Sequence, residues 1–260
     1  MSTFLFDKIV FGPVYSRRLG VSLGINLLPH THKLCTFDCI YCECGPNNIL
    51  ETKPDNLPSR EQVKLVLYQT LEELAANDND PDVITFAGNG EPTLHPDFPG
   101  IIEDTIEVRD IFFPYADIAV LTNSTTIDKP EIRNALSKIE KPILKLDSAF
   151  SETIKLHNRP ASDINAKDLI SNLAALDFEI TIQSMFIEGL IDNTLIDNTS
   201  EKEIAAWIQA LMFIKPREVQ VYTVSRETPA GADIKKVSLD KLNSIAEKVQ
   251  AIGIKTQVSA

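Results

Sequence analysis

The chain lacks a surplus of basic residues, a long hydrophobic run and a recognisable export signal. Its 260 residues include 25 Lys and Arg against 37 Asp and Glu, which gives a net charge of −12. Phosphate backbones repel such a surface, so the charge disfavours tRNA or another nucleic acid as a partner, although a local basic groove would allow one. No stretch of about 20 apolar residues is present, which argues against a membrane span. The first residues, MSTFLFDKIVFGP, do not form a secretory signal, so we expect a cytoplasmic protein with no membrane partner.

Cysteine is scarce, and all 4 cysteines lie in one loop, KLCTFDCIYCECGP, at residues 33–46. In the reducing cytoplasm a disulfide knot in this loop is disfavoured. The spacing is Cys35-x3-Cys39-x2-Cys42, followed by Cys44 two residues later. Three thiolates so close in sequence are able to surround one compact metal centre, which makes the loop a candidate metal site.

Three kinds of site fit the spacing of these cysteines. A structural zinc ion wants four ligands, usually as two pairs from separate segments, and no second pair is present elsewhere in the chain. A thioredoxin-like redox pair would use Cys39 and Cys42 and would leave the other two cysteines without a role. A [4Fe–4S] cluster held by Cys35, Cys39 and Cys42 would leave one iron open for a ligand from a substrate or cosubstrate.

The remaining candidate ligands near this loop are Cys44, His30 and His32. We expect the Cys44 side chain to point away from Cys42, as a bystander or as a thiol behind the ligands. Either histidine would complete a zinc site with three cysteines, but both are expected to be ordinary loop residues.

From residue 60 onward, predicted helices alternate with predicted strands. The helices are expected at 59–77, 97–109, 129–139, 165–176, 200–213 and 238–251, and the strands at 82–86, 117–122, 143–147, 178–186, 218–224 and 254–258. Such alternation with short connections predicts βα units and a parallel sheet. No linker or low-complexity tract divides the chain. We therefore predict one domain over residues 1–260, with an N-terminal extension over about 1–20 and a first strand in VSLGINLL.

Polar residues at the strand ends favour a barrel over a doubly wound sheet. A doubly wound sheet is covered on both faces, so its strands are continuously apolar. Here the predicted strands carry polar pairs at alternate positions, which share a face: Lys145 and Asp147, Thr181 and Gln183, and Gln220 and Tyr222. We expect them to face the interior of a partial (β/α)6 TIM-like barrel, near the mouth where barrel enzymes carry their chemistry.

Two motifs of the sequence resemble those of the radical S-adenosylmethionine (SAM) superfamily. The CxxxCxxC spacing with an aromatic residue, Tyr41, before the last cysteine is similar to that family's signature. FAGNGEPTLHP at 86–96 resembles its glycine-Glu-Pro motif, one βα unit after the cysteines. GPVYSRRLGVSLGINLLP also resembles a subgroup of Fe–S oxidoreductases related to the wyosine-base synthases of tRNA, except that Tyr15 stands where that subgroup commonly has proline.

The resemblance implies an enzyme with a [4Fe–4S] cluster and SAM as cofactors. Three cysteines would bind three irons, and SAM would chelate the fourth. An electron donor such as flavodoxin or ferredoxin would reduce the cluster, and cleavage of SAM would give a 5′-deoxyadenosyl radical that abstracts a substrate hydrogen. The difficult chemistry belongs to the cofactors, which the protein positions and shields; Tyr41 and Ile40 would exclude water.

The resemblance also assigns residues to SAM. The turn of Gly88, Asn89 and Gly90, whose glycines permit close backbone approach, would bind the ammonium group, with Glu91 adding a carboxylate. Polar residues at the next two strand ends would contact the ribose and the carboxylate. They are Asn123, Ser124, Lys145 and Asp147. Arg159 is a further candidate for the SAM carboxylate, because a guanidinium binds carboxylate bidentately.

The substrate side is expected from later strands and from the start of the chain. Gln183 and Tyr222 lie on strands where the family's substrates usually sit. Arg17 and Arg18 are adjacent, so in a strand at most one would face the site and bind an anionic group. The duplicated LIDNTLIDNT at 190–199 is expected as a loop, either a lid or a surface insertion.

The substrate itself is open at this stage. A small molecule or a protein such as a glycyl-radical partner is at least as compatible with the charge as a tRNA base. The rival hypothesis from another class is a non-catalytic zinc or redox protein, which would leave the glycine-Glu-Pro turn and the polar strand ends unexplained.

Overall fold

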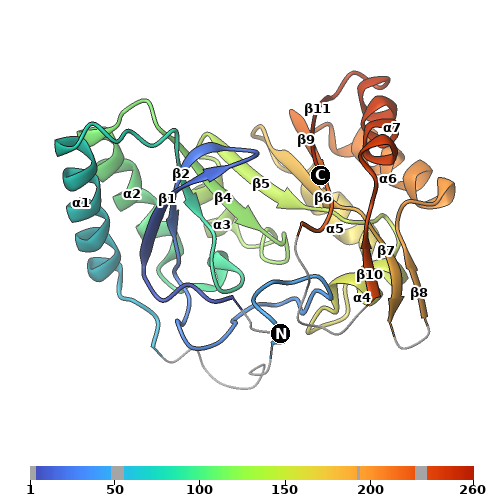
Figure 1. Ribbon diagram of the computed structural model, residues 1–260, viewed down its shortest axis with the longest axis horizontal. Helices are drawn as coiled ribbons and strands as arrows, with labels where there is room; N and C mark the ends of the chain where they lie inside the picture. Colours follow the sequence, from blue (N-terminus) through green and yellow to red (C-terminus); the bar gives the residue numbers. More distant parts are fainter. Residues whose placement is uncertain (1–3, 48–55, 192–193, 226–232) are drawn as a thin grey trace.

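One curled sheet of eight strands forms the body of the structure (Figure 1). The computed structural model describes residues 4–47, 56–191, 194–225 and 233–260. The strands follow the order β1 (Val10–Ser16), β2 (Gly20–Ile25), β3 (Val83–Phe86), β4 (Asp117–Thr122), β5 (Lys141–Lys145), β6 (Thr181–Met185), β9 (Glu218–Tyr222) and β11 (Lys255–Ser259). β1 is antiparallel to β2, and the strands from β2 to β11 are parallel to their neighbours. The predicted partial TIM-like barrel is confirmed.

The hairpin of β1 and β2 brings the two edges of this sheet together. Residues 10–16, expected in an extension before the barrel, form its first strand. Arg17 and Arg18 lie in the turn that follows, so the argument that they point oppositely from a strand is wrong. The Arg17 guanidinium donates to the Ala260 carbonyl, and Gln257 Nε2 donates to the Arg18 carbonyl over 3.3 Å. The turn is therefore fastened to the last strand.

Helices cover the outer face of the sheet, with α1 and α2 beside the first strands and α6 and α7 beside the last (Figure 1). They are α1 (Arg60–Ala76), α2 (Phe98–Phe112), α3 (Pro130–Leu136), α4 (Ser151–Asn158), α5 (Ala166–Ala174), α6 (Glu201–Ile214) and α7 (Leu239–Gln250), with a 3₁₀ turn, η1, at Pro92–Leu94. Ser59 caps α1, because its hydroxyl accepts from the Gln62 N–H in a capping box. The short helix α4 was not predicted. No described helix is long and apolar enough to cross a membrane.

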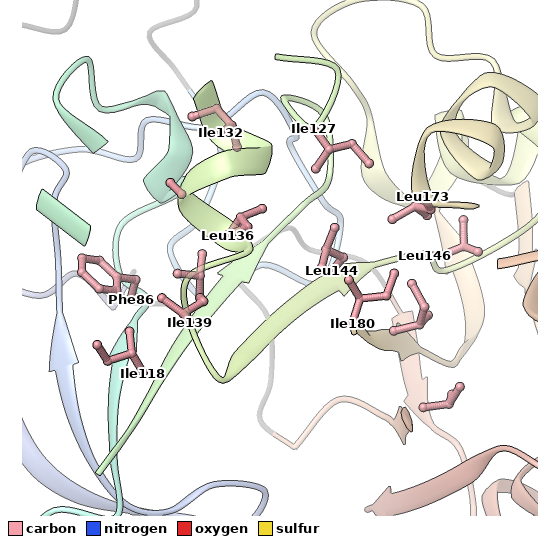
Figure 2. Close-up of a cluster of buried hydrophobic side chains, with 14 of the residues drawn as sticks. Phe86, Ile118, Ile127, Ile132, Leu136, Ile139, Leu144, Leu146, Leu173 and Ile180 are labelled. Carbon is pink, nitrogen blue, oxygen red and sulfur yellow. The ribbon is translucent and has the colours of Figure 1, made fainter. Parts of the chain in front are cut away.

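Apolar side chains from the strands and from the helices form the main core (Figure 2). Phe86, Ile118 and Leu144 point outward from three successive parallel strands and are fully buried. Leu136 of α3 lies in the same cluster. Because side chains alternate along a strand, the residues between these apolar positions face the inside of the barrel. Burying one such side chain contributes about 1.5–3 kcal/mol, so the outer layer supplies stability and leaves the inner face free for polar groups.

A small second sheet was not predicted. It has the strand order β10 (Asp233–Lys236), β7 (Ile187–Ile191) and β8 (Thr194–Asp197), all antiparallel. The duplicated segment 190–199 is therefore not a loop, because it contains the end of β7, at Leu190 and Ile191, and all of β8. Residues 192–193 lie outside the described residues. Ile191 and Ile196 belong to a buried cluster with Ile40 and Tyr41. The small sheet thus supports the cysteine loop from one side.

Candidate functional site

The cysteine loop lies over the carboxyl ends of the barrel strands and lines a cavity of about 180 Å³. The strands contribute Leu121, Lys145 and Gln183 to its wall. The turn after β3 contributes Gly88, Gly90 and Glu91. The cavity therefore combines the loop, the glycine turn and the polar strand ends, which the sequence had separated by up to 150 residues.

The loop turns so that all four thiols line this cavity. Cys42 N donates to the Cys39 carbonyl over 3.0 Å, and Gly45 N donates to the Cys42 carbonyl over 3.2 Å. With these consecutive turns Cys42 and Cys44 line the same cavity, so the expectation that Cys44 points away from Cys42 is wrong. The free Cys44 thiol instead forms a hydrogen bond with the Cys42 sulfur. This hydrogen bond lowers the pKa of Cys42 and raises the pKa of Cys44. The Cys44 thiol also lies 3.6 Å from the Gly88 carbonyl.

Backbone pairing holds the loop at both of its sides. Leu34 forms a parallel bridge with Gly90, and Ile40 N donates to the His157 carbonyl over 3.0 Å. Lys33, which the sequence did not single out, is buried and donates to Asp38 and to the Gly45 carbonyl over 3.0 and 3.1 Å. Burial lowers the pKa of Lys33, but the cysteine sulfurs and Asp38 together outweigh burial and raise it. A permanent cation therefore lies beside the thiols and favours their charged form.

The two glycines of the turn serve the packing of the loop. A Cβ on Gly90 would lie 1.8 Å from the Leu34 carbonyl oxygen, and a Cβ on Gly88 would lie 2.3 Å from Asn26 Oδ1. Both glycines have positive φ, at 155° for Gly88 and 142° for Gly90. The close approach that the glycines were predicted to permit is thus observed toward the chain itself. The Asn89 side chain points away from the cavity and bonds to the backbone of Phe6 and Pro29. Its N–H donates to Asn26 Oδ1 and its carbonyl accepts from Leu34 N, so the hydrogen-bonding groups of Asn89 serve the chain itself.

Glu91 is buried, and its own chain satisfies its carboxylate. Oε1 accepts from the Thr93 and Thr122 hydroxyls over 2.6 and 2.8 Å, and Oε2 accepts from Asn123 N over 2.6 Å. Burial raises its pKa, and these hydrogen bonds oppose the rise. Glu91 therefore joins the ends of β3 and β4, in addition to lining the cavity.

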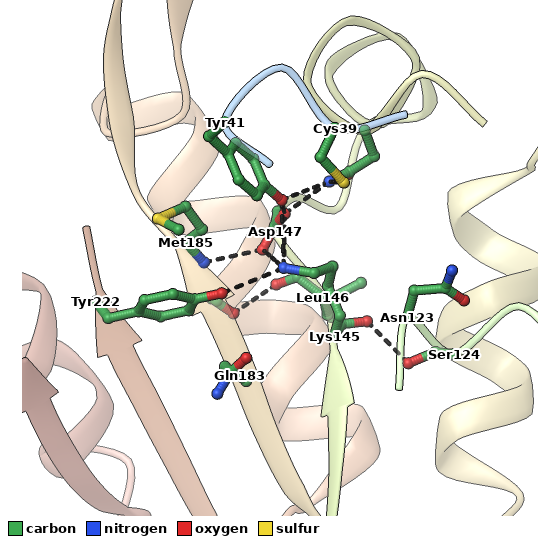
Figure 3. Close-up of polar contacts among 12 residues, drawn as sticks. Cys39, Tyr41, Asn123, Ser124, Lys145, Leu146, Asp147, Gln183, Met185 and Tyr222 are labelled. Carbon is green, nitrogen blue, oxygen red and sulfur yellow. Dashed lines mark hydrogen bonds and ion pairs between the residues drawn. The ribbon is translucent and has the colours of Figure 1, made fainter. Parts of the chain in front are cut away.

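Asp147 is the centre of a polar network that includes Tyr41 and Lys145 of the cavity wall (Figure 3). It accepts from the Tyr41 hydroxyl, from Asn158 Nδ2 at 2.8 Å and from Met185 N at 2.8 Å, and Lys145 Nζ lies 3.4 Å away. Burial lowers the pKa of Lys145, but Asp147, Tyr222 and Cys39 together outweigh burial and raise it. Lys145 therefore stays a cation within the barrel, beside the Asp147 side chain.

This network extends to the cysteine loop. Asn158 Nδ2 lies 3.5 Å from Cys39 Sγ and 2.7 Å from the Tyr41 hydroxyl. Sequence reasoning missed Asn158, because nothing in the pattern around it links it to residues more than a hundred positions away. Asn123 plays the matching part on the other side, with Nδ2 3.5 Å from Cys35 Sγ and 2.8 Å from Thr36 Oγ1.

Besides Asn89 and Asp147, two of the predicted SAM residues, Ser124 and Arg159, do not line this cavity. Ser124 is buried, and its hydroxyl donates to the Lys145 carbonyl over 3.0 Å. Arg159, at the end of α4 with φ 43°, lines a separate cavity of about 270 Å³ behind the cysteine loop, with Asp38 and Pro46. The structure therefore brings Asn123, Lys145 and Asp147 to the cysteines, and it leaves these two residues to other contacts.

The predicted substrate residues continue the network deeper into the barrel. Gln183 Nε2 donates to Gln220 Oε1 over 2.9 Å. The Tyr222 hydroxyl accepts from Lys145 Nζ over 3.3 Å, and the Arg18 guanidinium lies 4.5 Å from the centre of the Tyr222 ring. Arg17 and Arg18 both line a small cavity of about 90 Å³ beside Tyr222.

The cysteine loop and its cavity fit an iron–sulfur cluster. All four cysteines are free and line one cavity. In such a cluster each thiolate binds a different iron, and Cys35, Cys39 and Cys42 present three thiols at this cavity. The residues present therefore fit a [4Fe–4S] cluster.

His157, beneath the loop, predicts a pH-dependent stability. Neither ring nitrogen has a hydrogen-bond partner among the described residues, and burial lowers its pKa from 6.5 to about 4, against the opposing field of Asp147 and Asp197. Between these pH values the unfolded chain binds a proton that the folded chain does not, so stability falls as pH falls. We expect a loss of about 2.5 kcal/mol from this residue, measured as the difference between the wild type and His157→Leu in urea unfolding at pH 7 and pH 4.5. Equal pH dependence in the two proteins would contradict it.

Comparison with known proteins places these observations in a family. Residues 31–199 match the model described as the Radical SAM superfamily. Similar sequences include the protein named GTPase Obg of Brachyspira hyodysenteriae, 33% identical over 225 residues, which cover 86% of this chain and 31% of that protein. A UPF0026 protein of Synechocystis is 29% identical over 230 residues, which cover 86% of this chain and 78% of that protein. The chain thus spans less than a third of the first of these relatives.

Solved structures show the same fold. A radical SAM methyltransferase from Sphaerobacter thermophilus superposes with a TM-score of 0.67 at 13% identity, over 92% of this chain and 65% of that chain. Streptococcus suis SuiB bound to SAM gives 0.64 at 16% identity, over 91% and 50%. TYW1 with a lysine-pyruvate adduct bound gives 0.57 at 15% identity, over 88% and 73%.

Proposed function

This chain belongs to the radical SAM superfamily, and we propose that it is an enzyme that cleaves SAM reductively at the cavity under its cysteine loop. The family uses a [4Fe–4S] cluster and SAM as its cofactors. When bound, they supply a 5′-deoxyadenosyl radical, which removes a hydrogen atom from the substrate. The protein positions these cofactors and shields them from side reactions.

One observation carries this proposal. The thiols of Cys35, Cys39 and Cys42 share one cavity with Gly88 and Lys145, from the glycine turn and a strand end. A structural metal site would need only the loop, with its ligands closed around the ion. A loop whose thiols face a cavity lined by other elements supports binding of a second molecule beside the cluster.

The chain's own residues have distinct tasks in this proposal. Cys35, Cys39 and Cys42 hold the cluster, and Asn123 and Asn158 aim their amides at two of these sulfurs, which stabilises thiolate charge. Ile40, which lies within the loop, is buried and excludes water from that side of the cysteines. Asp147 keeps Lys145 charged within reach of an anionic ligand group in the cavity.

The substrate proposed here is a small molecule rather than tRNA or a protein with its own radical. The net charge of −12 disfavours a nucleic-acid backbone. The electron donor is proposed to be a flavodoxin or a ferredoxin. We also propose that residues 1–260 act as one domain. Binding of bulk tRNA at moderate salt would overturn the small-molecule assignment without touching the cofactor chemistry.

Anaerobic reconstitution with iron and sulfide tests the proposal. We expect the reduced protein to show the electron paramagnetic resonance signal of a [4Fe–4S] cluster, a change of that signal when SAM is added, and 5′-deoxyadenosine with a strong reductant. An unchanged signal together with absence of 5′-deoxyadenosine would contradict the proposal. Zinc without iron or acid-labile sulfide, in protein purified without air, would favour the non-catalytic alternative.

A further inference from the structure

A second cavity, of about 580 Å³, opens at the opposite end of the barrel from the cysteines. Lys141, Thr181, Glu218 and Lys255, the first residues of β5, β6, β9 and β11, line it. Arg18 from the hairpin turn and Arg217 before β9 complete its charged wall. Four cations thus face one cavity together with a single carboxylate, Glu218, in a chain whose net charge is −12. We call this the basic cavity.

Three of these cations already have carboxylate partners. Lys141 pairs with Asp117 over 2.8 Å, and Lys255 pairs with Glu218 over 2.7 Å. Arg217 pairs with Glu179 over 3.3 Å, with 41% and 74% of the two side chains exposed. Exposed pairs of this kind contribute only about 0–1 kcal/mol, so an anionic ligand is able to compete for the rim cations.

Arg18 differs from the other three cations. No described carboxylate lies within ion-pair distance of its guanidinium, which instead lies over the Tyr222 ring at 4.5 Å. Its backbone carbonyl is held by Gln257 of β11. The backbone of Arg18 is thus held by β11 and its guanidinium lies against Tyr222, and no described acidic side chain forms an ion pair with it.

A ladder of glutamines joins the basic cavity to the cysteine cavity. Gln183, Gln220 and Gln257 lie in register on β6, β9 and β11. Gln220 and Gln257 line the basic cavity, and Gln183 lines the cysteine cavity. The 2.9 Å bond from Gln183 to Gln220 is the boundary between the two cavities. One hydrogen-bonded pair of amides, Gln183 and Gln220, therefore separates a ligand in the basic cavity from the cysteine cavity.

We propose that the basic cavity binds a phosphate or carboxylate group of a small-molecule substrate, with Arg18 as its main contact and the rest of the molecule directed along the glutamine ladder. This inference rests on the proposed function, because it names the substrate class of the same barrel. The volume of the basic cavity lies within the roughly 300–1,000 Å³ typical of small-molecule sites. A guanidinium offers paired N–H donors that match both kinds of anion.

Binding of anion probes to the reconstituted protein tests this inference. Inorganic pyrophosphate and citrate are titrated separately by calorimetry, at fixed ionic strength. We expect Arg18→Gln to raise the Kd of the bound probe by about tenfold or more, since a hydrogen bond to a charged group contributes about 1.5–3 kcal/mol. Arg217→Gln should raise it by about two- to fivefold, as a partly exposed charge does. A probe that binds to the wild type identifies the class, phosphate or carboxylate.

The matched control is Arg60→Gln. Arg60 pairs with Asp104 and is 40% exposed, like Arg217, but it lies on α1 outside the basic cavity. Its variant should leave the Kd unchanged. Equal losses in Arg60→Gln and Arg18→Gln would overturn the inference, as would binding of neither probe to the wild type. Bulk tRNA binding that is lost in Arg18→Gln, without binding of either probe, would also overturn it and assign the cavity to a nucleic acid.

The outcome is independent of the cofactor chemistry. The same samples are assayed for 5′-deoxyadenosine, so a protein that cleaves SAM but binds neither anion rejects only this inference. A protein that binds an anion through Arg18 but never cleaves SAM rejects only the proposed function. Arg18→Lys guards against misfolding of the turn. It keeps the charge but loses the paired donors, and it should bind the probe with a Kd between those of the wild type and Arg18→Gln.

Discussion

Replacement of Cys35, Cys39 or Cys42 by Ala is expected to abolish cluster binding, whereas Cys44→Ala retains it. Each of the three thiolates is proposed to bind a separate iron, and Cys thiolates are what hold such clusters. Removing one leaves a cluster with two protein ligands in a half-open cavity, from which iron is lost. The measurement is iron and acid-labile sulfide per chain after anaerobic reconstitution, with the electron paramagnetic resonance spectrum as a second readout.

Cys44 makes this experiment decisive, because it lies in the same cavity and bonds to Cys42. It is therefore a matched control with the same side chain, the same loop and the same access to iron. Loss of iron in Cys44→Ala, with retention in Cys35→Ala, would replace the proposed ligand set by Cys39, Cys42 and Cys44. Loss in all four variants would make Cys44 a fourth ligand and leave no iron open for SAM.

Asp147→Asn is expected to lower the free energy of unfolding by about 3–5 kcal/mol, because it leaves the Lys145 ammonium buried without its carboxylate. The amide also turns a donor toward groups that now donate to Asp147, namely the Tyr41 hydroxyl and Asn158 Nδ2. Chemical denaturation in urea measures this loss. We expect the variant to retain less cluster as well, since Asn158 connects Asp147 to Cys39.

The matched control for that variant is Asp117→Asn. Asp117 also pairs with a lysine of β5, Lys141, over 2.8 Å, but its side chain is 36% exposed, against 1% for Asp147. An exposed pair contributes about 0–1 kcal/mol, so this variant should remain close to the wild type. Similar losses in both variants would show that burial of the Lys145 pair does not govern its contribution.

Local patterns predicted the architecture because they act over short distances in the chain. Ser59, three residues before Gln62, marks the start of α1, and the alternation of helices with strands predicted the parallel sheet. The same kind of reasoning failed for the segment 190–199. Antiparallel pairing of β7 with β10 joins residues far apart in sequence. The periodicity within each segment does not predict which other segment it pairs with.

The cysteine loop shows which features of the site local sequence patterns could not predict. Its spacing identified three candidate ligands, but the direction of Cys44 depended on two consecutive turns that the loop residues alone did not reveal. The glycine turn was correctly located, yet its close contacts are with Asn26 and Leu34, and not only with a ligand. Asn158 and Lys33 became visible only when the loop was folded against α4 and the turn.

By itself the sequence determined the family, the cysteine spacing and the βα order, because covalent spacing and side-chain periodicity are properties of the chain. Only the tertiary structure decided which charges share a cavity. Arg18 reaches Tyr222 because the first hairpin is fastened to the last strand, and the glutamines align because β6, β9 and β11 pair in register. Such neighbours arise because the sheet curls into a partial barrel. Electrostatic and hydrogen-bonding interactions depend on the distance between atoms in space, and not on their separation along the chain.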